Sequence, residues 1–519
     1  MADHIWLIAN SFTRWLWVPL ARHIAAQTGL KPVLLLQSEQ DKTFYAKQPG
    51  ADELIYRVLK DPYETVVSAP AESLPDHEVS ARLAACEQEF GFSVMREMLL
   101  PDRHLGRGYM LAGSGHPQSH TSDKSSFGNS LRACLEQVDF TLALFAEFPP
   151  AAVICYYGGG GIRYKPIAAI CRARDIPFRA FCPARFGGLA YWAEDEYEGS
   201  SHVVAALAKP EALPSEAEAE ILLRDIAPSA LATDPGALRR LRRLAQWPHI
   251  IKRAAHLAAQ RAYSRLRGYK AARTGYLVSS SIAHMLRMRS HWRLLDRLAL
   301  RKLPDLSGRK VVYFPLQQEP EASTLVLSPK NTNQLATITE LSLALPADAI
   351  LVVKEHIWQI GRRPDWFYDA LRSLPNVLLV HPEASGREMI ERADLVATIT
   401  SSAGFEAAAM GKMVVFFWDR SPLLPLPHVH DMTRGQGLER IAAMLHEDSE
   451  AAAAERKLQG ALFLRKLRQA CLDVAPMRFY SRSEAPTKDE LDMLTAPLFA
   501  DGALRRSADE GQAGQKLAG

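Results

Sequence analysis

The feature that most constrains this fold is a regular alternation of short apolar runs with helix-like segments between residues 310 and 417. Each of five runs is four to six residues long, too short for a buried helix, and most are rich in branched residues. Parallel strands need a crossover connection, usually a helix, so this spacing predicts a doubly wound parallel sheet. The predicted strands are Val311–Phe314, Ala349–Lys354, Asn376–His381, Leu395–Thr400 and Met413–Phe417.

The amino-terminal part of the chain repeats this pattern less regularly. Four apolar runs are expected to be strands, with helical patterns between them. Short buried strands joined by helices favour a second parallel sheet. The runs are His4–Asn10, Lys31–Gln37, Ala151–Tyr157 and Ile176–Phe181, and the clearest helix is Leu131–Glu147.

Between these two parts the chain changes character. Residues from about 203 to 305 are rich in Ala, Leu and Arg at helical spacing, so we expect several helices there. We therefore predict an α/β protein with two Rossmann-like lobes joined by a basic helical segment. The predicted parts are an amino-terminal Rossmann-like lobe at 1–202, the basic helical segment at 203–306, a carboxyl-terminal Rossmann-like lobe at 307–500 and a disordered tail at 501–519.

Charge is distributed unevenly along the chain. There are 62 Lys and Arg against 58 Asp and Glu, for a formal net charge of +4, but residues 235–295 hold 14 of the cations and no acid. Basic helices with interleaved apolar residues suit an anionic membrane surface, and a solvated linker packed on acidic lobes is the alternative. No recognised nucleic-acid motif accompanies the charge, so we expect no nucleic-acid partner. The predicted membrane or acceptor patch is Arg239, Arg240, Arg242, Arg243, Lys252 and Arg253.

Composition and cysteine usage narrow the class of protein. Apolar residues make up 48% and charged residues 23% of the chain, which excludes an intrinsically disordered chain. The six cysteines have no CxxC spacing and form no Cys/His cluster, so we expect reduced thiols, no metal site and a cytoplasmic location. We expect neither a signal peptide nor a transmembrane helix, because no suitable apolar stretch occurs.

Polar residues follow the predicted strands of the carboxyl-terminal lobe, which is where ligands bind in open α/β sheets. Lys354, Glu355 and His356 end one strand with a cation, a carboxylate and an imidazole. This set suits phosphate binding and proton transfer, and a surface loop of mixed charge is the alternative.

Two further loops in this lobe carry candidate residues. Small residues after Leu395–Thr400 let backbone N–H groups approach a phosphate, and a carboxylate in the next helical turn suits ribose hydroxyls. The same turn could simply cap a helix, and it has neither a P-loop nor a GxGxxG pattern. The loop Pro315–Thr324 adds Glu321 and a Ser-Thr pair. The turn residues are Ser401, Ser402, Gly404 and Glu406.

The amino-terminal lobe offers fewer candidates. Gly159 and Gly160 lie in a four-glycine run after a strand, which allows close approach of a ligand or only makes a flexible turn. Arg185 follows another predicted strand. Asp102 lies in a polar loop that is either an acceptor-binding loop or an ordinary surface loop.

Four segments of the carboxyl-terminal lobe, taken in order, resemble bacterial capsular and surface polysaccharide biosynthesis proteins. They cover about a fifth of the chain, and the Gly158–Gly161 and Asp102–His104 regions resemble the family more loosely. The segments are Tyr313–Thr324 (YFPLQQEPEAST), Val352–His356 (VVKEH), Leu374–Ser385 (LPNVLLVHPEAS) and Ala393–Lys412 (ADLVATITSSAGFEAAAMGK).

This resemblance implies a GT-B glycosyltransferase, with relatives that transfer Kdo from a CMP-activated donor. In such enzymes a KxHP-like element and a polar-xxx-Glu element hold the nucleotide. His356 matches the first element, and Ser402 with Glu406 matches the second. Ile357 stands where a proline usually follows the histidine, and a separate His381-Pro382 pair occurs further on, so UDP- and GDP-sugars stay open as donors. We expect no metal or other cofactor, and a lipid-linked or growing glycan as acceptor.

Under this interpretation the protein is cytoplasmic and peripheral to an anionic inner-membrane surface. Two other classes stay open: a nucleotide-sugar epimerase or hydrolase of the same shape, and a non-catalytic polysaccharide assembly or export partner. Carboxylates are the expected groups for glycosyl chemistry, so Asp102 and Glu321 are candidate catalytic residues. His356 is the third candidate, because an imidazole can assist proton transfer. The candidate donor-binding residues are Lys354, Glu355, Ser401, Ser402, Gly404, Glu406, Gly159, Gly160 and Arg185.

Overall fold

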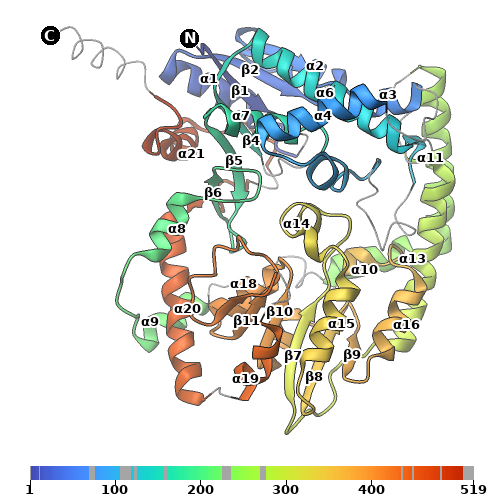
Figure 1. Cartoon of the computed structure of the whole chain (residues 1–519), viewed down its shortest axis with the longest axis vertical. Coiled ribbons are helices and arrows are strands. Elements are labelled where there is room, and N and C mark those ends of the chain that lie inside the picture. The colour runs from blue at the N-terminus through green and yellow to red at the C-terminus, as the bar shows by residue number, and fades with distance from the viewer. Residues whose placement is uncertain are drawn as a thin grey trace. The chain divides into compact units, whose positions relative to one another are not determined.

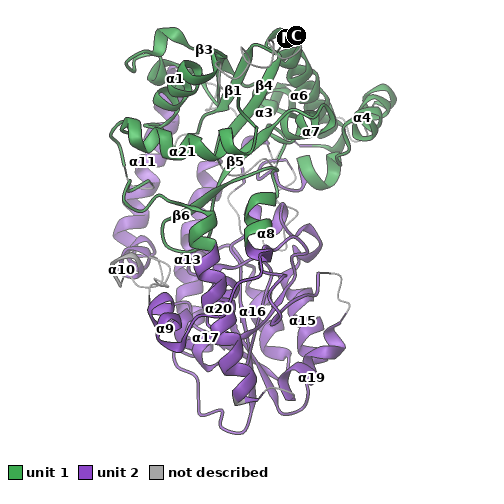
Figure 2. Cartoon of the chain, turned by 90° about the vertical axis from the view of Figure 1, so that its left-hand side faces the viewer, with its two compact units in different colours: residues 1–98, 126–206, 467–519 green, residues 99–125, 207–466 purple. Residues whose placement is uncertain are grey.

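The structure is a computed structural model of the chain, shown in Figure 1. The described chain forms two compact units, coloured in Figure 2. The first unit contains residues 1–98, 126–206 and 467–519, and the second contains residues 99–125 and 207–466. The structure describes residues 2–10, 12–68, 76–105, 118–121, 125–156, 161–224, 235–268, 276–433, 437–446, 449–479 and 482–505.

Each unit is made of separate segments of the chain, whereas the sequence suggested continuous domains. The boundaries of those domains stay predictions. The segment after residue 466 belongs with the first unit because Leu491, Leu494 and Leu498 lie in that unit's apolar core. The loop that begins at Leu99 belongs with the second unit. Most of the predicted tail, residues 506–519, lies outside the described residues.

The first unit is built on a seven-stranded sheet. Its order is β13-β6-β5-β4-β1-β2-β3, with parallel pairing from β5 to β3 and antiparallel pairing at β5–β6 and β6–β13. The central strands are apolar along their length, as strands covered on both faces must be. The strands are β1 (His4–Ile8), β2 (Lys31–Leu36), β3 (Ile55–Val58), β4 (Pro150–Tyr156), β5 (Phe178–Pro183), β6 (Leu189–Ala193) and β13 (Leu472–Asp473).

Helices complete the first unit. The apolar faces of α1 and α21 share one core with the sheet, and Trp192 donates a 2.8 Å hydrogen bond to the carbonyl of Leu494 on α21. The helices are α1 (Trp17–Thr28), α2 (Glu39–Tyr45), α3 (Pro62–Ser68), α4 (His77–Phe90), α6 (Phe127–Glu147), α7 (Lys165–Ala173) and α21 (Lys488–Ala500), with the π-helical turn η2 (Val94–Leu99).

The second unit contains a six-stranded parallel sheet of order β12-β11-β10-β7-β8-β9. The chain starts at β7 in the middle, adds β8 and β9 on one side, and then crosses to add β10, β11 and β12 on the other. The topological switch point therefore lies between β7 and β10, where open α/β sheets bind ligands. The strands are β7 (Lys310–Pro315), β8 (Ala349–Lys354), β9 (Val377–Val380), β10 (Leu395–Thr398), β11 (Met413–Phe416) and β12 (Val429–Asp431).

The helices of the second unit include those of the basic segment. Leu241 of α10 and Trp292 and Leu295 of α13 are buried in the same core as the sheet, so this segment is part of the unit's interior on one face. The helices are α9 (Glu216–Arg224), α10 (Pro235–Leu244), α11 (Trp247–Leu266), α13 (Val278–Leu298), α14 (Ala322–Leu325), α15 (Gln334–Ala344), α16 (Asp365–Ser373), α17 (Gly386–Arg392), α18 (Ser402–Ala409) and α19 (Ile441–His446). Two more, α8 (Ser201–Ala208) and α20 (Glu450–Ala470), cross the boundaries between the units, and short 3₁₀ turns are η1 (Ala51–Glu53), η5 (Pro329–Asn331), η6 (Ile357–Gln359) and η7 (Leu438–Arg440).

The predicted α/β class with two sheets is confirmed, and so is the helical character of the segment between them. All five predicted strands of the carboxyl-terminal lobe are present with ends shifted by up to two residues. The sequence pattern missed β3, β12 and β13, which lie at sheet edges, and β6, which is next to the edge strand β13. Within the described ranges, no helix combines the length and apolarity needed to span a bilayer.

Candidate functional site

The candidate site lies at the carboxyl edge of the second unit's sheet, at the ends of β7, β8 and β10. Two hydrogen bonds tie the loop after β7 to the loop after β10. The Gln317 amide donates to the Thr398 hydroxyl at 3.2 Å, and the Thr400 hydroxyl donates to the carbonyl of Ser323 at 3.2 Å. Polar contacts thus connect the ends of β7 and β10 across the switch point.

A buried arginine organises these strand ends. Arg363 is 1% exposed, and its guanidinium lies 3.0 Å from Glu319 and 3.0 Å from Glu355. It also donates a 2.7 Å hydrogen bond to the carbonyl of Gln317. A fully buried cation is stable only when carboxylates and acceptors surround it, so Arg363 fixes the loop after β7 against the loop after β8.

The two carboxylates that hold Arg363 have further partners. Tyr368 donates its hydroxyl proton to Glu355 at 2.9 Å, and the Gln334 amide donates to Glu319 at 2.6 Å. Glu355 also accepts the backbone N–H of His356, which sets the direction of the chain as it leaves β8. Burial raises the pKa of Glu319, and the charge of Arg363 opposes this effect.

Lys354 and His356 flank Glu355 at the end of β8. Burial lowers the pKa of Lys354 to about 8, and its ammonium donates a 3.1 Å hydrogen bond to the carbonyl of Pro382. Burial, together with the charges of Lys354 and Arg363, lowers the pKa of His356 to about 3, so this imidazole is neutral near pH 7.

The tautomer of His356 follows from its hydrogen bond. Its Nδ1 accepts the backbone N–H of Trp358 at 3.3 Å, where it caps η6. The proton of the neutral ring is therefore on Nε2. No described residue accepts a hydrogen bond from this Nε2, so it is a free donor at the strand end.

The turn after β10 brings Ser401, Ser402 and Glu406 to the same sheet edge. Ser401 caps α18 by accepting the backbone N–H of Ala403 at 3.2 Å. The carboxylate of Glu406 is half-buried and receives no hydrogen bond from the described residues, and burial raises its pKa. An added Cβ at Gly404 would lie 2.6 Å from Phe416 and 2.6 Å from Thr398, so this glycine lets α18 pack directly on β10 and β11.

Glu321 begins the turn that leads into α14. Its carboxylate accepts a 3.2 Å hydrogen bond from the Ser323 hydroxyl. Its charge acts on Arg362, whose pKa it raises while burial lowers it. Glu321 therefore lies at the same strand-end region as His356, on which the Arg362 charge also acts.

The remaining predicted residues belong to other segments of the chain. Gly159 and Gly160 are outside the described residues. Arg185, in the first unit, pairs with Glu198 at 2.7 Å in a left-handed backbone conformation. Asp102 is mostly buried, and one of its carboxylate oxygens accepts the backbone N–H groups of His104 at 2.8 Å and Leu105 at 2.7 Å.

The predicted basic patch divides into two kinds of residue. Arg242 pairs with Glu383 and, at 2.8 Å, with Asp296, and its guanidinium lies 4.4 Å from the centre of the Trp292 ring. Five others are exposed on α10 and α11: Arg239, Arg240, Arg243, Lys252 and Arg253. Within the described part of the chain, no three His, Cys, Asp or Glu side chains are grouped as a metal site would require.

Sequence reasoning missed Arg363, Glu319 and Gln317. A signal was present, because Arg362-Arg363 follows a predicted strand closely and Glu319 shares its loop with Glu321. The pattern alone does not tell which arginine of a pair is buried or which glutamate meets it. That choice is made by the packing of η6 and α16 around the strand ends.

Comparison with known proteins adds similarities of low degree. No protein-family model and no curated protein matches the chain. Among solved structures, the β-Kdo 2,7 transferase of KpsC from Thermosulfurimonas dismutans is 15% identical over 59% of this chain and 80% of its own, with a TM-score of 0.28. HepE of Anabaena, solved with UDP and glucose, is 11% identical over 92% of this chain and 99% of its own, with a TM-score of 0.30.

A third similar structure belongs to a different class of protein. The UDP-GlcNAc 2-epimerase from Neisseria meningitidis, solved with UDP-GlcNAc, is 10% identical over 88% of this chain and 93% of its own, with a TM-score of 0.27. Transferase and epimerase structures thus resemble the chain to the same low degree. These similarities carry no conclusion about its activity.

Replacing Arg363 tests whether it holds the strand ends together. Arg363→Met leaves the buried carboxylates of Glu319 and Glu355 without their cation, so we expect the free energy of unfolding to fall by about 3–5 kcal/mol. Urea unfolding followed by circular dichroism measures this change. The control Arg372→Met, at an exposed position on α16, is expected to change it by less than about 0.5 kcal/mol. Equal stability of the two variants would contradict the role given to Arg363.

Proposed function

We propose that the chain is a glycosyltransferase of bacterial surface (capsular) polysaccharide biosynthesis with GT-B architecture. It transfers a sugar from a nucleotide donor, CMP-Kdo-like or a UDP- or GDP-sugar, to a lipid-linked or glycan acceptor. The observation that supports the proposal is that Lys354 and His356 at the end of β8, and the carboxylate of Glu406 on the helix after β10, belong to the carboxyl edge of one sheet, with the Nε2–H of His356 and the Glu406 carboxylate unpaired among the described residues. A cation, a neutral donor and a carboxylate are the groups that a nucleotide's phosphate and ribose need.

Each group has a distinct part in the proposed reaction. Transfer forms a bond between the acceptor oxygen and the anomeric carbon, and breaks the bond from that carbon to the donor phosphate. Lys354 and the Nε2–H of His356 stabilise the negative charge that grows on the departing phosphate. Glu406 accepts the ribose hydroxyls, and Ser401 and Ser402 bring the start of α18 toward the phosphate.

The other residues act on the site or on the acceptor. Glu355 positions His356 through its backbone N–H and is itself fixed by Arg363. Gly404 allows α18 to approach β10 closely. The proton of the acceptor hydroxyl passes to a carboxylate, for which Asp102 and Glu321 are the candidates.

Nucleotide titration tests the donor site directly. We expect one of CMP, UDP and GDP to bind in isothermal titration, and His356→Ala and Glu406→Gln each to weaken it about tenfold through the loss of one hydrogen bond to a charged group or hydroxyl. His446→Ala and Glu388→Gln, at exposed positions of the same unit, are matched controls that should bind normally.

The outcomes of this experiment separate the three classes of protein. Incubation with a panel of nucleotide sugars follows the titration. Release of free sugar or of an epimer without any acceptor favours an epimerase or hydrolase. Absence of all nucleotide affinity contradicts the proposal, and together with co-purification in a polysaccharide-assembly complex it favours a non-catalytic partner.

The pKa of Lys354 predicts how nucleotide affinity changes with pH. Because burial lowers this pKa to about 8, the ammonium is charged below pH 8 and loses its proton above it. Affinity for the nucleotide phosphate should therefore be full near pH 7 and fall by up to about tenfold per pH unit above pH 8. Titration of the wild type and of Lys354→Met at several pH values measures this. A wild-type profile as flat as that of the variant contradicts the role of Lys354.

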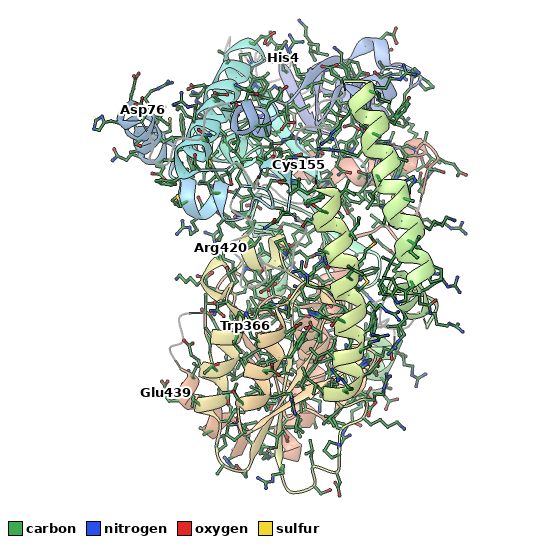
Figure 3. The ribbon with its side chains drawn as sticks, turned by 90° about the vertical axis from the view of Figure 1, so that its right-hand side faces the viewer. His4, Asp76, Cys155, Trp366, Arg420 and Glu439 are labelled. Carbon is green, nitrogen blue, oxygen red and sulfur yellow. The ribbon has the colours of Figure 1, made fainter. Side chains whose placement is uncertain are left out.

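The proposed membrane contact rests on the surface of α11. This helix carries exposed apolar side chains, Trp247, Ile251, Tyr263 and Leu266, next to exposed basic ones. Figure 3 shows α11 beside α13, and the two helices pack against each other. One face of α11 is thus held by the protein, while its outer face combines apolar and basic groups as an interfacial helix does.

Vesicle binding tests this surface. The full chain should sediment with vesicles containing phosphatidylglycerol and not with pure phosphatidylcholine vesicles, because each basic residue near an anionic surface contributes about 1 kcal/mol. Lys252→Gln combined with Arg253→Gln should lower binding roughly tenfold or more. The control pair, Arg309→Gln with Arg372→Gln, removes the same charge elsewhere on the second unit. Equal binding of both double variants contradicts this contact.

A further inference from the structure

Two arginines near the end of β8 have no counterion of their own among the described residues. Arg362 is half-buried, and its Nε is buried without a hydrogen-bond acceptor. Arg103 is exposed on the loop 99–105 of the same unit, and its guanidinium has no ion pair. An arginine whose Nε is withdrawn from water without an acceptor is costly, and in a native structure it often marks a place for a ligand.

The loops that carry these two arginines both attach to α13 or to the residues just before it, and the charges of both arginines act on Tyr276. Tyr276, just before α13, pairs with Ser119 in an antiparallel bridge, and the His104 ring lies 5.0 Å from the Tyr276 ring. This contact holds the loop of Arg103 at the start of α13. A backbone hydrogen bond next to this bridge adds a second contact: the N–H of Leu277 donates to the carbonyl of Gln118 at 2.8 Å.

Further along, α13 holds the loop of Arg362. The imidazole of His291 accepts the backbone N–H of Gly361 at 3.1 Å and bonds to Asp365 at 2.7 Å through its other nitrogen. An added Cβ at Gly361 would lie 2.7 Å from the backbone of Met288, so the loop packs directly on the helix. The same helix therefore fixes the positions of both arginines.

Charges of both signs act at this place, and those of the two arginines oppose each other. Burial lowers the pKa of Arg362, and the charge of Arg103 lowers it further, while Glu321 raises it. The charge of Arg362 in turn acts on His356. Asp102, next to Arg103, acts on Tyr276 together with both arginines. The two guanidinium groups repel each other, and a bound anion would relieve this repulsion.

We propose that Arg103 and Arg362 form a second anion subsite beside His356, for a carboxylate or phosphate group carried by the sugar or the acceptor. Guanidinium groups present paired N–H donors that match the oxygens of both anions. This subsite is separate from the nucleotide phosphate, which the proposed function assigns to Lys354 and His356. The inference rests on that proposed function, because it takes the anion to be a group of the transferase's substrate.

The test uses the full chain and three small probes in ligand-observed NMR titrations. Glucuronate supplies a carboxylate, inorganic phosphate supplies a phosphate, and glucose supplies a neutral sugar. We expect at least one anion to bind and glucose not to bind, and the anion that binds identifies the group. Arg103→Gln and Arg362→Gln should each weaken that anion about tenfold, and the exposed control Arg372→Gln should not.

Nucleotide titration of the same variants separates this subsite from the donor site. We expect their affinity for the bound nucleotide to change by less than about threefold, which is below 1 kcal/mol. The subsite is overturned if neither anion binds, if both variants bind the anion as the wild type does, or if both lose nucleotide affinity tenfold. If no nucleotide binds the wild type but the anion binds in an arginine-dependent way, the proposed function fails and the subsite stands. Thermal melts of each variant confirm that it is folded.

Discussion

The ion pairs of Arg363 with Glu319 and Glu355 hold the carboxyl edge of the second sheet in one arrangement. Loops after parallel strands have few backbone partners, so side chains must fix them. A buried guanidinium does this with directional hydrogen bonds to both loops, and moving either loop would leave a charge without a partner in the interior. The position of His356, and hence of everything that η6 and α16 present at this edge, follows from this contact.

The same ion pairs also determine the charge of the site. Glu355 is next to Lys354 in the sequence, yet its carboxylate is used by Arg363 and Tyr368. Among the described residues, the Lys354 ammonium donates a hydrogen bond only to the carbonyl of Pro382. Burial of the internal carboxylates thus leaves a cation and a neutral imidazole donor at the sheet edge, a combination that attracts phosphate. The ion pairs of Arg363 in the interior therefore leave the sheet edge able to bind an anion.

How far the sequence predicts this structure depends on the range of the interactions. The alternation of apolar runs predicted five of the six strands of the second sheet, since burial on both faces leaves a strong local pattern. It did not place α21 in the first unit, because that requires contacts between Leu494 and residues some 300 positions away.

Within the candidate site, Lys354, His356 and Glu406 follow from their positions after strands. The partners of Arg363 do not, because the pairing depends on how the loops after β7 and β8 pack together. The sequence predicts that Gly404 lets the backbone approach a ligand. The structure shows that packing also requires a glycine here, since Phe416 and Thr398 leave no room for a Cβ.

The net charge of a segment, like a strand pattern, depends on local sequence alone. It does not show which charged residues form ion pairs in the folded protein and which form an exposed patch. Residues 235–295 contain no acid, yet Arg242 of this segment meets Glu383 and Asp296, which lie outside it. Arg301 joins the same two carboxylates, so four charges and the Trp292 ring attach α10 and α13 to the sheet. The apolar residues of this segment divide in the same way, with Leu241 and Leu295 in the core and Trp247 and Leu266 exposed. One face of the segment therefore stabilises the second unit, and only the charges left on α11 and the outer side of α10 are available to an anionic surface.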